Sequence, residues 1–127
     1  MNKKLVLAAS VLGLTAIILG AFGAHGLKKI LTAEELITFE TGVKYQMYHA
    51  LFLLFLASNT LISESAKKVI FYLVLPGVLF FSGSIYLLAT TSVTAINFSF
   101  LGPVTPIGGL LLILAWGKLF VAVFGKK

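Results

Sequence analysis

The sequence predicts an all-α integral membrane protein: a single transmembrane domain over residues 1–127, built as an antiparallel four-helix transmembrane bundle. The main observation is a stretch of 49 residues, from Val69 to Gly117, that contains no Asp, Glu, Lys or Arg. About 20 apolar residues suffice to cross the ~30 Å hydrocarbon core of a bilayer, so this stretch fits two crossings joined by an uncharged turn. Two further uncharged runs, Leu5 to Leu27 and Tyr45 to Ser63, bring the number of crossings to four.

The first span is expected at about residues 5–24. Its small residues recur at alternating steps of four and three positions, along one side of the helix: Ala9, Gly13, Ala16, Gly20 and Gly23. Small residues let membrane helices approach closely, so this stripe predicts a packing face inside the bundle, with a homodimer interface as the alternative. A cleaved signal peptide is disfavoured because its apolar region is about 7–15 residues long, whereas this run is about 20.

A second helix is expected to begin near Ala33. Thr32 followed by Glu35 is typical of a capping box, in which each side chain bonds the other residue's backbone N–H. Residues 33–44 are predicted to be an interfacial helical segment in the headgroup region. They either extend the second span, at about 45–63, or form a separate helix broken at Gly42.

The third and fourth spans are expected at about residues 69–90 and 107–124. Pro76 and Gly77 predict a kink in the third span, which neighbouring helices can tolerate. The uncharged connection turns at the glycine and prolines of residues 102–106. Small residues repeat every seven positions in the fourth span and predict a second packing stripe: Gly108, Ala115 and Ala122.

The charges predict the orientation in the membrane. Ten Lys and four Glu, with no Arg or Asp, give a formal charge of +6. Six lysines fall on the side of the two termini and the 64–68 turn, and three on the other: Lys3, Lys4, Lys67, Lys68, Lys126 and Lys127 against Lys28, Lys29 and Lys44. Positive residues favour the cytoplasm, so both termini are expected there, with the protein in the cytoplasmic (inner) membrane.

The same composition limits the partners and the chemistry. Lysines that flank apolar runs meet lipid headgroups, and no basic stripe is long enough to follow a nucleic acid, so membrane lipids are the expected partner and nucleic acid is not. A homo-oligomer or other membrane proteins are further possible partners. The absence of cysteine excludes disulfides and thiolate metal sites.

The candidate site is a polar patch at the outer ends of spans one and two. It consists of His25, Tyr45, Gln46 and His49, with His49 at its centre and bonded to at least one partner. Gln46 and His49 lie inside a span and must find hydrogen-bond partners there, as structural contacts or as a functional polar site. The two histidines could in principle ligate a haem, but nothing else in the sequence supports one, so no cofactor is expected.

Secondary candidates are the remaining polar residues in or beside the spans. Glu40 and Lys44 are spaced for an ion pair one helical turn apart. Lys118 is expected to extend its amine to the cytoplasmic headgroups. Hydroxyls in the third span are expected to form interhelical hydrogen bonds: Ser82, Ser84 and Tyr86. No carboxylate lies within a span to activate a nucleophile, so neither a catalytic residue nor a metal site is expected, and the protein is not expected to be an enzyme.

Four sequence blocks together carry a resemblance to a known family. They are residues 20–27 (GAFGAHGL), residues 39–50 (FETGVKYQMYHA), residues 81–86 (FSGSIY), and residues 101–109 (LGPVTPIGG) followed by Ala115-Trp116-Gly117. In these blocks the chain resembles the YgdD/YwdK-like family of small bacterial inner-membrane proteins, whose function is unknown. The resemblance implies four spans and supplies no catalytic residue, substrate or cofactor.

Two functions are therefore kept as hypotheses. The first is a non-enzymatic structural or accessory protein that acts through helix–helix contacts. The second is a small oligomeric channel or transporter, or a lipid or small-molecule binder, that uses the polar patch. A polar cavity reaching the membrane midplane would favour the second, and a closed, packed interior the first.

Overall fold

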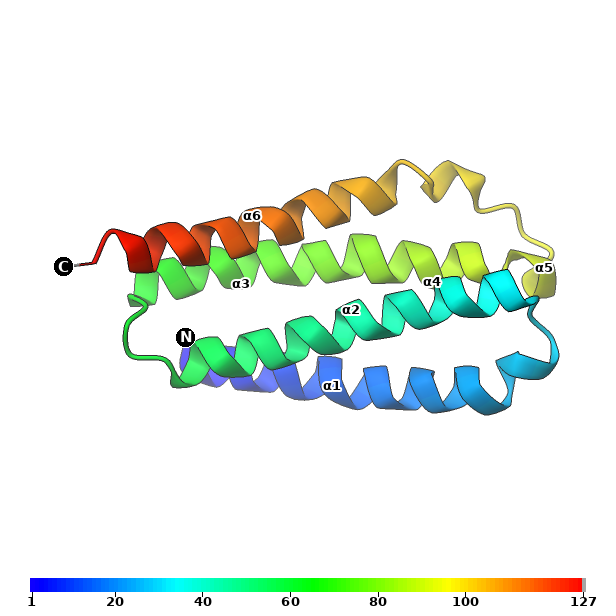
Figure 1. The fold of residues 1–127 in the computed structure, drawn as a ribbon, viewed down its shortest axis with the longest axis horizontal. Helices are drawn as coiled ribbons and strands as arrows, with labels where there is room; N and C mark the ends of the chain where they lie inside the picture. Colours follow the sequence, from blue (N-terminus) through cyan, green and yellow to red (C-terminus); the bar gives the residue numbers. More distant parts are fainter. Residues whose placement is uncertain (127) are drawn as a thin grey trace.

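A computed structural model describes residues 1–126, which form helices joined by loops and turns. The long elements lie side by side and alternate in direction (Figure 1): α1 (Asn2–His25), α2 (Ala33–Ser58), α3 (Glu64–Val78) with its continuation, and α6 (Val104–Phe124). The continuation of α3 is η2 (Leu79–Gly83) and α4 (Ser84–Ala89). The connections contain η1 (Leu27–Lys29), α5 (Thr91–Thr94) and η3 (Ser99–Leu101). The predicted all-α class is confirmed.

Three helical segments are long and apolar enough to cross a membrane: Asn2–Lys29, Glu64–Ala89 and Ser99–Phe124. The expected second span, in α2, is not among them. Its 26 residues would be ~39 Å long, which is sufficient, but its first half carries charged and polar side chains that lower its hydropathy. The structure thus supports three of the four expected spans by length and composition.

Helix α2 is continuous from Ala33 to Ser58. The capping box forms as predicted, with the Glu35 N–H donating to Thr32 Oγ1 at 3.1 Å and the Thr32 N–H donating to Glu35 Oε1 at 3.0 Å. The helix does not break at Gly42, because this glycine is buried against Ile85 and Tyr86 of α4. Residues 33–44 therefore extend the second helix and do not form a separate one.

Together α3, η2 and α4 form one helical segment, the third rod (residues 64–89). It begins at Glu64, five residues before its expected start, because Ser63 accepts a hydrogen bond from the Ala66 N–H and caps it. Pro76 lies inside α3 without ending it. A π-helical turn, η2, follows directly, and the chain continues as α4. Wider turns of this kind are one of the usual ways in which a helix absorbs an interruption.

The stripe of small residues on α1 packs against α2. Gly23 lies against Phe39 and Gly20 against Val43: a Cβ added at either glycine would be 3.1 or 3.4 Å from these side chains. Ala9, Ala16 and Gly23 are buried. The stripe is the packing face inside the bundle that the sequence predicts, and α2 already covers it.

The second stripe brings α6 against α3 and η2. A Cβ added at Gly108 would lie 2.3 Å from the backbone N of Phe81 and 2.8 Å from the Gly77 carbonyl oxygen, so only glycine fits there. Ala115 is fully buried in the main core, together with Leu112. α6 packs on α3 and η2, whereas α2 packs on α1 and on the third rod. α2 and α6 consequently lie further apart than the pairs α1–α2 and α3–α6.

Candidate functional site

Gln46 is the centre of a hydrogen-bond network that joins α1, α2 and α4. Its side chain is 5% exposed. Its Nε2 donates to Thr15 Oγ1 at 2.6 Å and to the Leu12 carbonyl at 2.9 Å, both on α1. Its Oε1 accepts from the Tyr86 hydroxyl at 2.7 Å. Both ends of the amide are therefore satisfied inside the protein.

Ser82, in the π-helical turn, adds a second bond between α2 and the third rod. Its hydroxyl is buried and donates to the Gly42 carbonyl oxygen at 2.7 Å. Because Gly42 has no side chain, the third rod approaches α2 closely at this point. Ser84 serves a different neighbour: it bonds the hydroxyl of Thr105 at the start of α6. The predicted interhelical role of Ser82, Ser84 and Tyr86 is seen in each case.

His49 is 3% exposed and bonds through both ring nitrogens. Its Nδ1 lies 2.7 Å from the Tyr45 carbonyl oxygen, and its Nε2 lies 3.1 Å from the indole Nε1 of Trp116 on α6. An indole N–H only donates, so Nε2 must be the unprotonated acceptor and Nδ1–H the donor to the carbonyl. The contact thus selects one neutral tautomer and connects α2 with α6.

The structure does not bring His25 to this cluster. His49 lies beside the level of Gly13, near the middle of α1, because Gly13 faces the next residue, Ala50. His25 is exposed at the end of α1, twelve residues or ~18 Å further along the helix. The expected patch is therefore in the middle of the bundle and not at its outer end, because the antiparallel α2 begins twelve residues before Tyr45.

The other candidates lie at the surface or remain unpaired. The Tyr45 ring is 40% exposed and packs on Phe81, with ring centroids 4.9 Å apart; only its carbonyl joins the cluster. The expected Glu40–Lys44 pair is not formed, since the ion pairs among residues 1–126 are both at Glu64. Lys118 is partly buried on α6.

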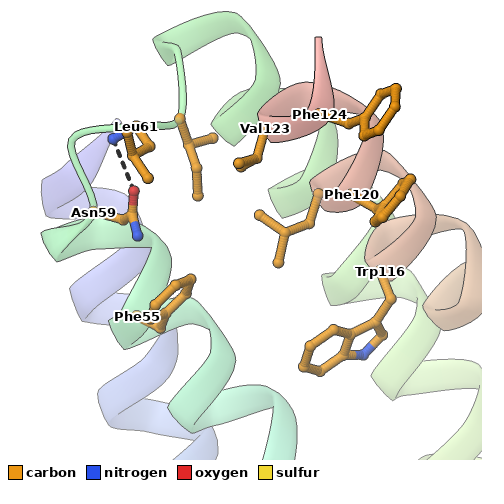
Figure 2. Close-up of a pocket in the computed structure, with 9 residues that line it drawn as sticks. Phe55, Asn59, Leu61, Trp116, Phe120, Val123 and Phe124 are labelled. Atoms are coloured by element: carbon orange, nitrogen blue, oxygen red, sulfur yellow. Dashed lines mark hydrogen bonds between the residues drawn. The ribbon is translucent and has the colours of Figure 1, made fainter. Parts of the chain in front are cut away.

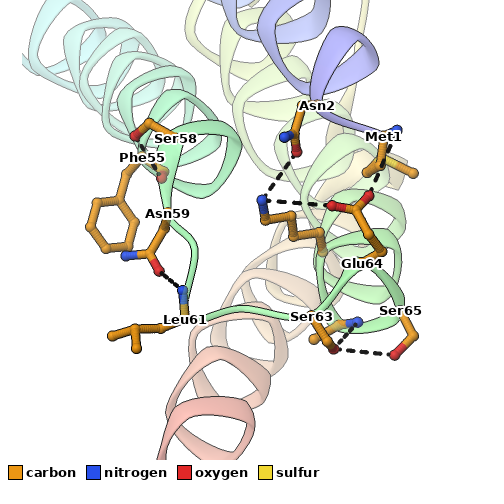
Figure 3. Close-up of polar contacts among 11 residues, drawn as sticks. Met1, Asn2, Phe55, Ser58, Asn59, Leu61, Ser63, Glu64 and Ser65 are labelled. Atoms are coloured by element: carbon orange, nitrogen blue, oxygen red, sulfur yellow. Dashed lines mark hydrogen bonds and ion pairs between the residues drawn. The ribbon is translucent and has the colours of Figure 1, made fainter.

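A second buried polar group, Lys67, ties α3 to the start of α1 through Asn2 and Glu64, which Figure 3 shows side by side. Its side chain is 4% exposed. Its Nζ donates to Asn2 Oδ1 at 3.1 Å and lies 3.9 Å from Glu64 Oε1. The other oxygen of Glu64 lies 3.9 Å from the Met1 amine. The sequence predicts Lys67 at the membrane surface but not its burial.

Hollows flank the polar cluster. The central groove, of about 470 Å³ between α2 and α6, is lined by Tyr45, His49, Phe81, Gly109, Leu112, Ile113 and Trp116. The terminal groove, of about 530 Å³, continues beyond Trp116 and is lined by Phe55, Asn59, Leu61, Ile62, Trp116, Leu119, Phe120, Val123 and Phe124 (Figure 2). A third hollow, of about 440 Å³, reaches Thr15, Gln46, Ser82 and Tyr86 between α1 and the third rod. Trp116 separates the first two.

The chemistry available at the site is hydrogen bonding and apolar contact. Among residues 1–126, no buried side-chain nitrogen or oxygen lacks a partner, and no three His, Asp or Glu residues gather as a metal site. The amide, hydroxyls and imidazole at the centre are all used within the protein. The site therefore fixes helices relative to one another and leaves laterally placed grooves beside them.

Membrane-length helices in an all-α fold, with a polar centre bonded internally, define a multi-pass α-helical membrane protein. The chain belongs to the UPF0382 family: the model described as "Protein of unknown function (DUF423)" matches residues 19–109. It is 37% identical to the membrane protein YwdK of Bacillus subtilis over 122 residues, covering 94% of this chain and 95% of YwdK.

Two further relatives extend this result. A UPF0382 membrane protein of Haemophilus influenzae is 38% identical over 126 residues, covering 99% of this chain and 97% of the relative. The inner membrane protein YgdD of Escherichia coli is 32% identical over 130 residues, covering 99% and 93%. None of the solved structures matches the chain. The expected resemblance is confirmed, and the chain is a multi-pass inner-membrane protein of a family of unknown function.

Sequence reasoning misses two members of the cluster, Trp116 and Thr15. Trp116 is the single tryptophan of the chain and lies in a block that carries the resemblance, which is a signal but does not indicate a partner. Thr15 sits in an apolar span with its hydroxyl also donating to the Val11 carbonyl, so it looks satisfied locally. Only the packing of α1 and α6 reveals which α2 residue each one meets.

Proposed function

We propose that this chain is a non-enzymatic accessory protein of the inner membrane that acts by packing a transmembrane helix into its central groove. The partner is a second copy or another membrane protein. The observation that carries the proposal is the open lateral face between α2 and α6, since α6 packs on the opposite side, against α3 and η2. The two stripes of small residues cannot be the surface that binds the partner helix, because they are already covered inside the bundle.

The groove has the features of a helix-packing surface. Its floor includes Gly109, and an added Cβ there would meet nothing closer than 3.6 Å. Ile113 is 68% exposed on the same face of α6, and Trp116 is half exposed. Small residues beside large apolar ones allow close approach of a neighbouring helix in lipid, where van der Waals packing drives association.

The proposal includes the arrangement in the membrane. We infer that α2 is a fourth crossing, because it lies beside α1 over its whole length and its neighbours on both sides are membrane-length helices. The buried polar residues Gln46 and His49 would then be tolerated because they bond to α1, α4 and α6 and do not face lipid. The lysine distribution supports cytoplasmic termini.

A channel or transporter has less support. The third rod is not broken at Pro76 and Gly77, so it offers no unwound backbone of the kind that binds substrates in transporters. The central polar side chains bond to one another, and the described part of the chain contains no carboxylate near them. The third hollow does reach Gln46 and Ser82, but both side chains are already hydrogen-bonded within the protein and more than half of the lining residues are apolar. Helix contacts therefore have more support than a water-filled path.

Site-specific photo-crosslinking in native membranes tests the proposed function. A photoreactive residue at Ile113 should give one discrete protein adduct, whereas the same residue at Leu14, equally exposed on α1, should give lipid adducts. A self-adduct would identify a homo-oligomer, and another partner would identify an accessory subunit. Lipid adducts alone at both positions would contradict the proposal.

A further inference from the structure

The terminal groove differs from the central one in its position and its surroundings. It lies between the last turns of α2 and α6, at the end of the bundle that carries both termini (Figures 1 and 2). Its walls are aromatic and aliphatic, and Asn59 at the rim uses its oxygen to accept the Leu61 N–H at 2.8 Å. Phe55, Phe120 and Phe124 are half exposed or more, so the groove opens sideways to the membrane.

The shape of the groove suits the end of a lipid chain. Along α6 it extends from Phe124 to Trp116, eight residues or ~12 Å, and it opens toward the end of the bundle that carries both termini. Its inner end is a fixed wall. Trp116 stacks on Phe52, with ring centroids 4.0 Å apart and an interplanar angle of 25°, and its N–H bonds His49.

The charge at this end specifies the headgroup. Among residues 1–126, five lysines and one acidic residue lie at the end where the groove opens: Lys3, Lys4, Lys67, Lys68, Lys126 and Glu64. At the opposite end, three lysines are balanced by three glutamates: Lys28, Lys29, Lys44, Glu34, Glu35 and Glu40. Lys67 is engaged by Asn2 and Glu64, which leaves a net positive rim that complements an anionic headgroup.

We propose that the terminal groove binds one acyl chain of an anionic phospholipid, with the lipid phosphate at the lysines of this end and the chain stopping at Trp116. The inference goes beyond the proposed function, since it concerns a different groove and a lipid partner. It does not depend on whether a helix occupies the central groove.

Native mass spectrometry of the detergent-purified full chain tests this proposal. The probes are dioleoylphosphatidylglycerol and dioleoylphosphatidylcholine, which share acyl chains and differ in headgroup charge. The wild type should retain one phosphatidylglycerol at least about fivefold more than phosphatidylcholine, because only the former is anionic. The variant Leu119→Trp, which fills the groove, should lose this retention at least about fivefold. Its matched control is Leu114→Trp, at an exposed position of α6 outside the groove, which should leave retention unchanged.

Further variants separate the headgroup from the chain. Lys126→Glu should lower retention of phosphatidylglycerol and leave that of phosphatidylcholine unchanged. If Leu119→Trp does not fold, as judged by circular dichroism, Val123→Trp fills the same groove. Equal retention of both lipids by the wild type would overturn the proposal, as would equal phosphatidylglycerol retention by the groove-filling variant and Leu114→Trp. A protein dimer lost in the groove-filling variant would show a second copy in the groove and would also overturn it.

Discussion

The imidazole of His49 illustrates how single contacts position the helices. It has a donor on one side and an acceptor on the other, and the structure supplies the matching group for each: the Tyr45 carbonyl and the Trp116 indole N–H. The first contact lies within α2, so its loss would be local. The second is the direct polar link between α2 and α6, two helices that otherwise enclose open grooves.

Trp116→Phe should destabilise the protein by about 0.6–2 kcal/mol, because the ring can still stack on Phe52 while His49 Nε2 loses its donor in a buried site. Thermal unfolding in detergent, followed by circular dichroism, measures the change. The double variant Trp116→Phe/His49→Ala should lose less stability than the sum of the losses in the two single variants. Full additivity would show that the hydrogen bond contributes nothing.

Gln46→Leu should be more destabilising than Tyr86→Phe. The first change removes the acceptor of the buried Tyr86 hydroxyl and the donor to Thr15 Oγ1 and the Leu12 carbonyl, whereas the second removes one donor and retains the aromatic contact with Phe39. We expect a loss of about 1–3 kcal/mol for Gln46→Leu. Chemical unfolding of both variants in the same detergent gives the comparison, and the reverse order would contradict the central role of Gln46.

The sequence predicts which polar residues need hydrogen-bond partners, but it does not identify those partners. Gln46 and His49 are predicted as buried and bonded because an apolar span leaves no water for them. Their place in the membrane is predicted about one helical turn deep and is found at the middle of α1. Helical periodicity gives the face of α2 on which they lie, but the rotation of α1 and α6 depends on packing that a single sequence does not reveal.

At the scale of elements, small residues decide how closely the rods approach. The α1 stripe meets α2 and the α6 stripe meets the third rod, so each outer helix is held by one inner helix. The sequence predicts both stripes from their spacing. It leaves open whether α2 continues through Gly42, which depends on a glycine covered by α4. It does not predict the early start of α3 at Glu64, which depends on a serine cap in a short turn.

Gly108→Ala should separate α6 from the third rod and cost about 1–3 kcal/mol or more, since the added Cβ would meet rigid backbone at Phe81 and Gly77. Gly117→Ala, on the same helix, is the matched control. Nothing lies within 4 Å of its Cβ position, so this change should not destabilise the protein, and the higher helix propensity of Ala should stabilise it by up to about 1 kcal/mol. Equal melting temperatures for the two variants would contradict this packing.

The capping box of α2 should weaken in acid. The Thr32 backbone N–H, and then the Ser92 hydroxyl, hold the pKa of Glu35 below its ordinary value of 4.5. A lowered pKa means that the stabilisation is complete above the ordinary value and is lost as the pH falls through the lowered one. Glu35→Gln keeps a capping group that does not titrate. The difference in melting temperature between wild type and variant should therefore change only below about pH 4.5, and a difference that is constant down to pH 3 would contradict the prediction.

At the scale of the whole molecule, charge divides the two ends. One end carries the lysine excess and the terminal groove, whereas the other has balanced charges and joins α2 to α5 through the Ser92–Glu35 contact. The all-α membrane class follows from long uncharged runs and is predictable. The fourth crossing is also expected from the sequence, but α2 is not among the membrane-length apolar helices, because the polar residues that build the centre lower its hydropathy.

The absence of cysteine makes the topology directly measurable. Single cysteines at Ile30 and Leu61, exposed residues on either side of α2, should react differently with a membrane-impermeant maleimide applied to spheroplasts. Ile30→Cys should be labelled from outside, and Leu61→Cys only after lysis. Ile96→Cys, in the connection before α6, should behave like Ile30→Cys. Identical labelling at Ile30 and Leu61 would show that α2 does not cross the membrane.

The π-helical turn at Leu79–Gly83 sets how many residues this part of the helix must contain. Removing one residue there would allow ordinary α-helical bonding, which is a local improvement. It would also rotate everything after the turn by ~100° relative to everything before it. Gly77 could then stay against Gly108 only if Ser82 and Tyr86 turned away from α2. The π-helical turn therefore lets the third rod contact α6 before the turn and α2 after it. This segment should accept substitutions more readily than a one-residue deletion.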